Sequence, residues 1–316
     1  MERTFTYYIT KTDAGRTIRD FLYSRGYSRQ NLIALKKIPE SILVNGRWEY
    51  VTYQLNAFET LVIHLVEQDE NEHILPINLP FPIVYEDEDL MIINKPSNMP
   101  THPSLNNYDN TLANAAAYHF KKLGIPYTFR CINRLDKDTT GLTILAKHAV
   151  SAGLLSNMVK NRAIKREYRA IVSGSLPAQS GIIDAPIGRV NDSLITRQVD
   201  YENGGSAITH YRLLAKGNTL SYVSLLLETG RTHQIRVHMA HIGCPLVGDY
   251  LYHPDYNQKC PVKVPQYPPF FPDLKRQALH AFRLCFCHPI THEKMDFTAP
   301  LPDDMNTILS KITACN

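Results

Sequence analysis

The sequence predicts an α+β fold in which helices and strands are mixed and neighbouring strands pair antiparallel. Two long segments, 206–216 and 219–228, alternate apolar and polar residues, and only a short loop separates them. A loop of that length joins antiparallel strands, whereas parallel strands need a long crossover. Segment 82–96 likewise reads as two short apolar strands around an acidic turn. A doubly wound sheet would instead alternate single strands with helices.

Residues 1–66 are expected to form a small α+β module. Segment 15–26 places its apolar residues on one helical face, and Ser28 can cap a second helix that runs to residue 37. ILVNGR (42–47) reads as a strand that enters an Asn-Gly turn, and 59–67 reads as an apolar strand. The basic side chains of the two helices could follow a phosphate backbone or simply form a solvated surface. They are Arg16, Arg19, Arg25, Arg29, Lys36 and Lys37.

A linker over 67–79 is predicted next, because this stretch is acidic, contains proline and lacks periodicity. A larger domain is expected over 80–305, followed by a C-terminal tail over 306–316. After the strand pair in 82–96, its predicted elements are a helix over 111–123 ended by Gly124, a strand over 142–146, a helix over 148–162, a strand over 165–174 and the two long strands. A long loop rich in proline and tyrosine is predicted over 252–275.

Length, charge and cysteine spacing exclude several classes of protein. A chain of 316 residues is long enough for one large and one small domain. There is no run of about 18 apolar residues, and the first residues lack the basic-then-apolar layout of a secretory signal, so a cytoplasmic protein without a membrane span is expected. The six cysteines form no C-x-x-C pair, which favours free thiols over disulfides or zinc. A net charge of +4 alone is too small to identify a nucleic-acid partner.

The stretch INRLDKDTTGL (132–142) carries the densest chemistry, with Arg134, Asp136 and Asp138 close together. DKDTT matches the D-x-D-x-T loop of magnesium-dependent phosphatases, in which the first aspartate attacks phosphorus. Those loops follow a buried parallel strand, and the residues before this one are too polar for such a strand. For 138–141 a turn that satisfies backbone amides is the favoured interpretation. It leaves Arg134 and Asp136 unexplained.

This stretch and several others resemble the RluA-type pseudouridine synthases. INRLDKDTTGL is similar to the active-site motif H-R-L-D-x-x-T-S-G of that family. The resemblance implies a catalytic domain with a largely antiparallel mixed sheet and a central active-site cleft. The module over 1–66 resembles the alpha-L RNA-binding motif of a small ribosomal protein. The other similar segments, in the family's order, are YEDEDLMIINKPSNMPTHPS, KREYRAIVSG, LETGRTHQIRVHMAHIGCPLVGDYLY and RQALHAFRLCFCHPI with APLPDD.

The resemblance also implies the roles of four residues. Asp136 aligns with the catalytic aspartate, which either attacks the sugar or removes a proton from its second carbon. Arg231 aligns with the buried cation that keeps this carboxylate ionised. Tyr168 is expected to stack on the uracil, and Ile235 to pack against its other side. No cofactor is implied, because the isomerisation involves no net redox change.

The implied substrate is structured RNA, ribosomal or transfer, whose target uridine must leave its stack. Arg134 is expected to fill the vacated space or grip the adjacent phosphate. Lys165 belongs to the run 130–169, which has nine Lys or Arg against three acids and is expected to contact RNA. Asn133 stands where the family usually has histidine, and its amide is expected to sustain activity at this substrate-binding position.

The function predicted from the sequence is a cofactor-independent, monomeric RNA pseudouridine synthase. Two alternatives stay open: a non-catalytic RNA-binding protein on the same fold, motivated by Asn133, and a magnesium-dependent phosphatase. His233, His238 and His241 match no zinc-site spacing, so structural roles and no metal are predicted for them.

Overall fold

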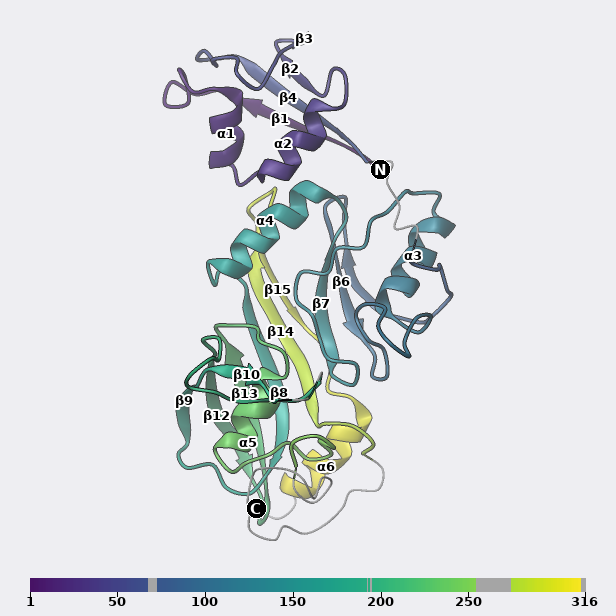
Figure 1. Cartoon of the computed structure of the whole chain (residues 1–316), viewed down its shortest axis with the longest axis vertical. Coiled ribbons are helices and arrows are strands. Elements are labelled where there is room, and N and C mark those ends of the chain that lie inside the picture. Colours follow the sequence, from purple (N-terminus) through teal and green to yellow (C-terminus); the bar gives the residue numbers. More distant parts are fainter. Residues whose placement is uncertain (68–72, 192, 194, 254–273, 314–316) are drawn as a thin grey trace.

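The computed structural model describes residues 1–67, 73–191, 193, 195–253 and 274–313 (Figure 1). Most of the predicted loop over 252–275 therefore lies outside the described residues, as do Cys260 and Cys315. Within the described ranges, no helix is both long enough and apolar enough to cross a membrane. A small N-terminal module stands at one end of a long sheet domain (Figure 1).

The N-terminal module is a four-stranded sheet in the order β1-β4-β2-β3, with two helices packed against one face. Both predicted helices are present, and the Ser28 hydroxyl caps the second one by accepting a hydrogen bond from the Asn31 amide. Asn45 and Gly46 both have positive φ, at 50° and 79°, as a tight hairpin turn requires. The elements are β1 (Glu2–Tyr8), α1 (Ile18–Ser24), α2 (Arg29–Lys36), β2 (Ile42–Val44), β3 (Arg47–Trp48) and β4 (Thr60–Val66).

The larger domain is built on a nine-stranded sheet in the order β5-β6-β7-β14-β8-β13-β12-β9, with β15 paired to β14. All strand pairs are antiparallel except β14 with β7, so the predicted mixed, largely antiparallel sheet is confirmed. The strands are β5 (Ile83–Glu86), β6 (Leu90–Lys95), β7 (Thr140–Ala146), β8 (Lys165–Ser173), β9 (Ser180–Asp184), β12 (Ile208–Lys216), β13 (Leu220–Leu227), β14 (Leu279–Cys287) and β15 (Lys294–Thr298). A separate two-stranded sheet pairs β10 (Ile187–Arg189) with β11 (Arg197–Val199).

Helices cover both faces of this sheet. Residues of α4 pack with Ile144 and Leu284, and residues of α5 pack with Tyr168 and Val223 on the same face. On the opposite face, α3 packs under β6 and β7, and α6 packs against Ile171 of β8. The helices are α3 (Leu112–Lys122), α4 (Ala149–Lys160), α5 (Gln234–His241) and α6 (Asp303–Thr313).

The N-terminal module is joined to the sheet domain by buried polar and apolar contacts at the start of α4. Arg3 donates two hydrogen bonds to the Asp89 carboxylate, at 2.9 and 3.2 Å. The Glu67 carboxylate accepts the Ala149 backbone amide at 2.7 Å, and Val150 belongs to the core of the N-terminal module. The two parts therefore share one core at this joint, and α4 lies between them (Figure 1).

The described part of the predicted linker also packs against the sheet domain. Ile74 and Leu79 contact the apolar core around α3. Leu75 accepts a hydrogen bond from the Asn114 side chain at 2.8 Å, and Ile77 donates to the Asn114 carbonyl at 3.2 Å. This stretch is therefore fixed along α3 even though its sequence shows no periodicity.

Candidate active site

A cavity of about 270 Å³ opens on the sheet face that carries α4 and α5. The loop before β7, strand β8 and the segment around the start of α5 form its walls. The cavity brings together six of the seven residues that the sequence marks as site residues. They are Asn133, Arg134, Asp136, Tyr168, Arg231 and Ile235.

Among the described residues that line the cavity, Asp136 is the only carboxylate, and an arginine holds it. The Arg236 guanidinium donates a hydrogen bond from Nη1 to Asp136 Oδ2 at 3.1 Å. The Asp136 side chain is 26% exposed, and its Oδ1 accepts no hydrogen bond from the described residues. One carboxylate oxygen is thus anchored, while the other stays available to a molecule in the cavity.

A second carboxylate, buried behind the cavity wall, orients Arg236. Asp249 is 0% exposed and accepts Nε and Nη2 of Arg236 at 2.7 and 2.8 Å. Burial alone would lower the pKa of Arg236, but the hydrogen bonds and charges of Asp249 and Asp136 outweigh burial and raise it. The guanidinium therefore stays charged, and its fork geometry leaves Nη1 directed at Asp136.

Arg231, the predicted partner of Asp136, lies at the rim of the cavity instead. Its side chain is exposed and its Nε donates to the Ser206 carbonyl at 3.1 Å. The prediction that Arg231 supplies the buried cation is wrong, because Arg231 follows Gly230 in a surface turn while Arg236 lies on a buried helix. Thr-Gly-Arg is a typical turn sequence with exposed side chains, which was the available signal in favour of Arg236.

Tyr168 and Ile235 form an aromatic and an aliphatic wall, and both are buried. Burial raises the pKa of the Tyr168 hydroxyl, so this group is protonated at neutral pH. Among the described residues the hydroxyl makes no hydrogen bond, and it remains free to interact with a bound molecule. The two walls suit a flat, neutral ring.

His233 is a cavity residue for which the sequence predicts a structural role. It caps α5 in the left-handed conformation, with φ 58°, and its Nδ1 lies 2.8 Å from the Tyr252 hydroxyl. Its Nε2 lies 3.8 Å from Asp136 Oδ2. Burial lowers the pKa of His233, so the ring is neutral at neutral pH. Position and charge state make His233 a neighbour of Asp136 rather than a second cation.

Lys165, whose contact with RNA stays a prediction, lies outside the cavity. It lines a separate groove on the opposite face of the sheet, together with Glu167 and Arg283. Alternate side chains of a strand point to opposite faces, and Lys165 is out of phase with Tyr168. Arg166 is in phase with Tyr168 and lines the cavity, and this period of two in KREYRA was the signal that identifies it.

Asn133 reaches the cavity wall, but its amide is committed to strand β7. Its Nδ2 donates to the Leu142 carbonyl at 3.2 Å, and its Oδ1 accepts the Ile144 amide at 2.8 Å. The side chain is buried. The position that departs from the family motif therefore fastens the motif loop to the sheet, and it has no direct contact with the Asp136 carboxylate.

Lys95 and Gly141 hold the loop that carries Asp136. The buried Lys95 ammonium donates to the carbonyls of Pro96, Met99 and Lys137 at 2.7, 2.8 and 3.0 Å. Gly141 has φ 110°, and a Cβ there would lie 2.3 Å from the Ala281 carbonyl oxygen. The predicted turn over 138–141 is thus shorter than expected, because Thr140 and Gly141 already belong to β7.

Thr140 reaches into the core instead of capping a turn. Its hydroxyl lies 2.8 Å from His280 Nδ1, and His280 Nε2 lies 3.3 Å from the Ala299 carbonyl. Since a carbonyl can only accept, Nε2 carries the proton and Nδ1 accepts from Thr140. Asp138 accepts the Asn98 amide at 3.2 Å, so it also braces a neighbouring loop.

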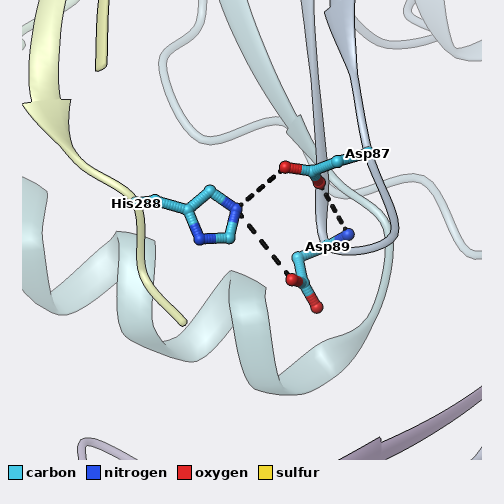
Figure 2. A group of neighbouring side chains, drawn as sticks. All are labelled: Asp87, Asp89 and His288. Carbon is cyan, nitrogen blue, oxygen red and sulfur yellow. Dashed lines mark hydrogen bonds and ion pairs between the residues drawn. The ribbon is translucent and has the colours of Figure 1, made fainter. Parts of the chain in front are cut away.

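His238 and His241, for which the sequence predicts structural roles, do not face a common point with His233. The buried ring of His238 contacts the Thr209 hydroxyl at 2.9 Å and the Ala185 carbonyl at 2.8 Å. His241 ends α5. Among the described residues, one group has the spacing of a metal site, namely Asp87, Asp89 and His288 at the joint with the N-terminal module (Figure 2).

The hydrogen bonds around this group favour a structural joint over a metal site. His288 Nδ1 accepts the backbone amides of Ile290 and Thr291, at 3.2 and 3.0 Å. Nδ1 therefore carries no proton, and Nε2 must carry it, which leaves no lone pair there for a metal. Nε2 faces the two carboxylates, 3.0 Å from Asp87 and 3.9 Å from Asp89 (Figure 2).

Comparisons with known proteins identify the family that this chain resembles. A family model described as RNA pseudouridylate synthase matches residues 89–241. The uncharacterized RNA pseudouridine synthase YjbO of Bacillus subtilis (strain 168) is 36% identical over 293 residues, which cover 93% of this chain and 98% of that protein. The ribosomal large subunit pseudouridine synthase D of Pasteurella multocida (strain Pm70) is 40% identical over 252 residues, which cover 79% of this chain and 76% of that protein.

A solved structure shows the same fold. Human RNA pseudouridylate synthase domain containing 4 superposes with a TM-score of 0.58 at 25% sequence identity. The match covers 73% of this chain and 93% of that chain.

Proposed function

The chain belongs to the RluA-type RNA pseudouridine synthases, isomerases that convert uridine to pseudouridine in RNA, and we propose that Asp136 is its catalytic carboxylate. The observation that carries this proposal is the geometry of the carboxylate. One oxygen of Asp136 is anchored by Arg236, and the other accepts no hydrogen bond from the described residues. In the part of the chain that the structure describes, it is also the only carboxylate that lines the cavity.

The reaction needs a carboxylate that is held in place and has one oxygen available to the substrate. The bond between ribose and N1 of uracil breaks, the base turns, and C5 is joined to the same ribose carbon while its hydrogen leaves as a proton and N1 takes up a proton. Asp136 acts on the ribose, either as a nucleophile at the first carbon or as a base at the second. Both roles need an ionised carboxylate in a partly closed cavity, and Arg236 stabilises the ionised form.

We further propose that the uracil lies between Tyr168 and Ile235. The two side chains offer flat apolar surfaces to a base that has left its stack, and stacking on an aromatic ring offsets part of the cost of flipping. The Tyr168 hydroxyl, protonated because burial raises its pKa, can donate a hydrogen bond to the turning base. Arg134, exposed at the rim of the cavity, is placed to contact the strand from which the uridine leaves.

The RNA that we propose as substrate is that of the large ribosomal subunit. The support is the name of relatives such as the Pasteurella multocida protein, which is a ribosomal large subunit pseudouridine synthase. The N-terminal module is proposed to bind the same RNA through the basic side chains of α1 and α2, all of which are exposed. Together the two contacts would position one structured region of RNA over the cavity.

The test compares Asp136→Asn with Asp138→Asn in cells that lack the native gene. Pseudouridine is mapped in total RNA, including ribosomal RNA, after each variant is supplied. Asp136→Asn should abolish every site that the wild type restores, since loss of an acid-base or nucleophilic group lowers the rate by at least about 10²-fold. Asp138→Asn removes an equal charge two residues away and should restore them. Restoration by Asp136→Asn would overturn the assignment, and sites restored outside ribosomal RNA would overturn the proposed substrate.

A further inference from the structure

Arg166 is a buried arginine in the cavity that the reaction outlined above does not use. It is 7% exposed and lies on β8 in phase with Tyr168. Its Nη2 donates to the Thr229 carbonyl at 3.2 Å, and its buried Nε has no hydrogen-bond partner among the described residues. Arg236, the other buried arginine of the cavity, is held by two carboxylates. Arg166 has no acidic partner among the described ion pairs.

A buried guanidinium in this state has lost water without gaining equivalent partners. Removing a charge from water is costly, and a carbonyl on one nitrogen replaces only part of the lost hydration. An oxygen acceptor that entered the cavity would supply the missing interaction. The adjacent loop leaves room for it, because a Cβ on Gly230 would lie 3.0 Å from Arg166 Nη1 and glycine has none.

The charge around the cavity favours an anion over a neutral base edge. Of the described residues, four arginines line the cavity, namely Arg134, Arg166, Arg231 and Arg236, and Asp136 is the only acid that does. The four arginines carry four positive charges. Asp136 and Asp249, which lies behind Arg236, supply two negative charges, so a net charge of +2 remains. A neutral uracil leaves that excess unchanged, whereas a phosphate group reduces it.

From these observations we propose that Arg166 binds a phosphate of the flipped nucleotide, next to the position where Tyr168 takes its base. The inference rests on the proposed function, since it assumes that the uridine enters this cavity. Residues two apart on a strand are about 6.6 Å apart, a spacing that a single nucleotide bridges between its base and its phosphate. Arg166 thus fixes the backbone of the nucleotide whose base Tyr168 holds.

The variants are Arg166→Gln and Lys165→Gln. Both remove one positive charge from adjacent positions of β8, but Lys165 is exposed on the other face of the sheet. The RNA is a synthetic hairpin that carries a uridine mapped as a product site, either unmodified or with one methylphosphonate in place of the phosphate on its 5′ or its 3′ side. Turnover is followed by release of tritium from C5 of the uridine, and binding is measured in the Asp136→Asn background.

Arg166→Gln should raise KM about 10- to 100-fold and leave kcat within about threefold, because a contact made equally in ground and transition states acts on binding alone. One of the two methylphosphonates should weaken binding of the wild type about tenfold and leave Arg166→Gln unaffected. Lys165→Gln should respond to each methylphosphonate as the wild type does. Arg166→Lys, which keeps the charge, should show an intermediate KM and remain sensitive to the same methylphosphonate.

Three results would overturn the proposal. In the first, the effects of Arg166→Gln and of each methylphosphonate simply multiply, so that no phosphate is coupled to Arg166. In the second, Arg166→Gln keeps its phosphate sensitivity but no longer prefers uridine to cytidine at the target, which would mean that Arg166 contacts the base. In the third, kcat falls while KM is unchanged, which would mean that Arg166 only positions Tyr168. Failure of the proposed function looks different, since the wild type would then release no tritium.

Discussion

Replacing Asp249 by asparagine should reduce catalysis although Asp249 does not line the cavity. Asp249 holds Arg236 by two hydrogen bonds, and Arg236 holds Asp136 by one. An asparagine would turn one acceptor into an NH₂ group that faces the donors of the guanidinium. Arg236 would then turn toward its remaining anion or toward water, and Asp136 would lose its fixed orientation.

The size of the effect follows from burial. Asp249 is fully buried and Arg236 nearly so, and breaking such a pair on one side costs about 3–5 kcal/mol. With an unfolding entropy of about 2.1 cal/mol/K per residue, that cost lowers the Tm of this 316-residue chain by about 5–8 °C. Misplacement of a reacting group by about 1 Å costs on the order of 10² in rate, so kcat should fall by about that factor.

Tritium release and thermal unfolding of the purified variant measure both effects. Because Asp249 is outside the cavity, KM should stay within about threefold of the wild type. Asp296→Asn is the matched control, since Asp296 forms the same two-bond fork with Arg283, at 2.7 and 2.6 Å, on an exposed surface. It should cost less than about 1 kcal/mol and leave kcat unchanged. A variant of Asp249 that loses stability but keeps the full kcat would refute the reasoning, because Asp136 would then need no support from Arg236.

Three further predictions concern the supports of the motif loop. Lys95→Met should cost at least about 3 kcal/mol in urea unfolding and most of the activity, because three backbone carbonyls lose their donor; full activity would show that the loop holds itself. Gly141→Ala should cost more than about 3 kcal/mol in urea unfolding, because its Cβ would meet the Ala281 backbone. Its control is Gly124→Ala, which has φ 69° and nothing within 4 Å of its Cβ and should cost about 1 kcal/mol. Equal costs would contradict the steric argument. Burial lowers the pKa of His280 from 6.5 to about 4. Between pH 6.5 and 4 the unfolded chain therefore binds a proton at this residue and the native protein does not. The free energy of unfolding should fall by about 3 kcal/mol as the pH drops from 7 to 4. His280→Gln should remove that part of the pH dependence in urea unfolding, and an unchanged pH profile would show that the imidazole is not buried in its neutral form.

Much of the fold could be predicted because the signals were local. The pairing of 206–216 with 219–228 follows from their short loop, and the structure confirms β12 and β13 as an antiparallel pair. The helices that became α1 to α4 carry an apolar face or an N-cap that the sequence shows directly. Helix α5 is absent from the predicted elements because residues 234–239 alternate polar and apolar side chains, a period of two and not 3.6, and the polar ones are buried as well.

The positions of the charged side chains of the candidate site were harder to predict than those of the apolar side chains that form its walls. Tyr168 and Ile235 were found through the family resemblance, and the structure places both at the cavity. The family alignment assigns the partner of Asp136 to Arg231, but the structure buries Arg236 on α5 instead. Lys165 and Arg166 show the same limit, since charge counted along the chain does not say which face of a strand carries it.

The joint at the start of α4 bears on how a uridine would be chosen. Because Val150 lies in the core of the N-terminal module and Arg3 is tied to Asp89, the distance from α1 and α2 to the cavity is set by packing and not by a flexible tether. If the module binds RNA as proposed, only a uridine that lies at the matching distance from that contact can reach Asp136. Loosening the joint would then leave the chemical step intact and widen the set of uridines that are modified.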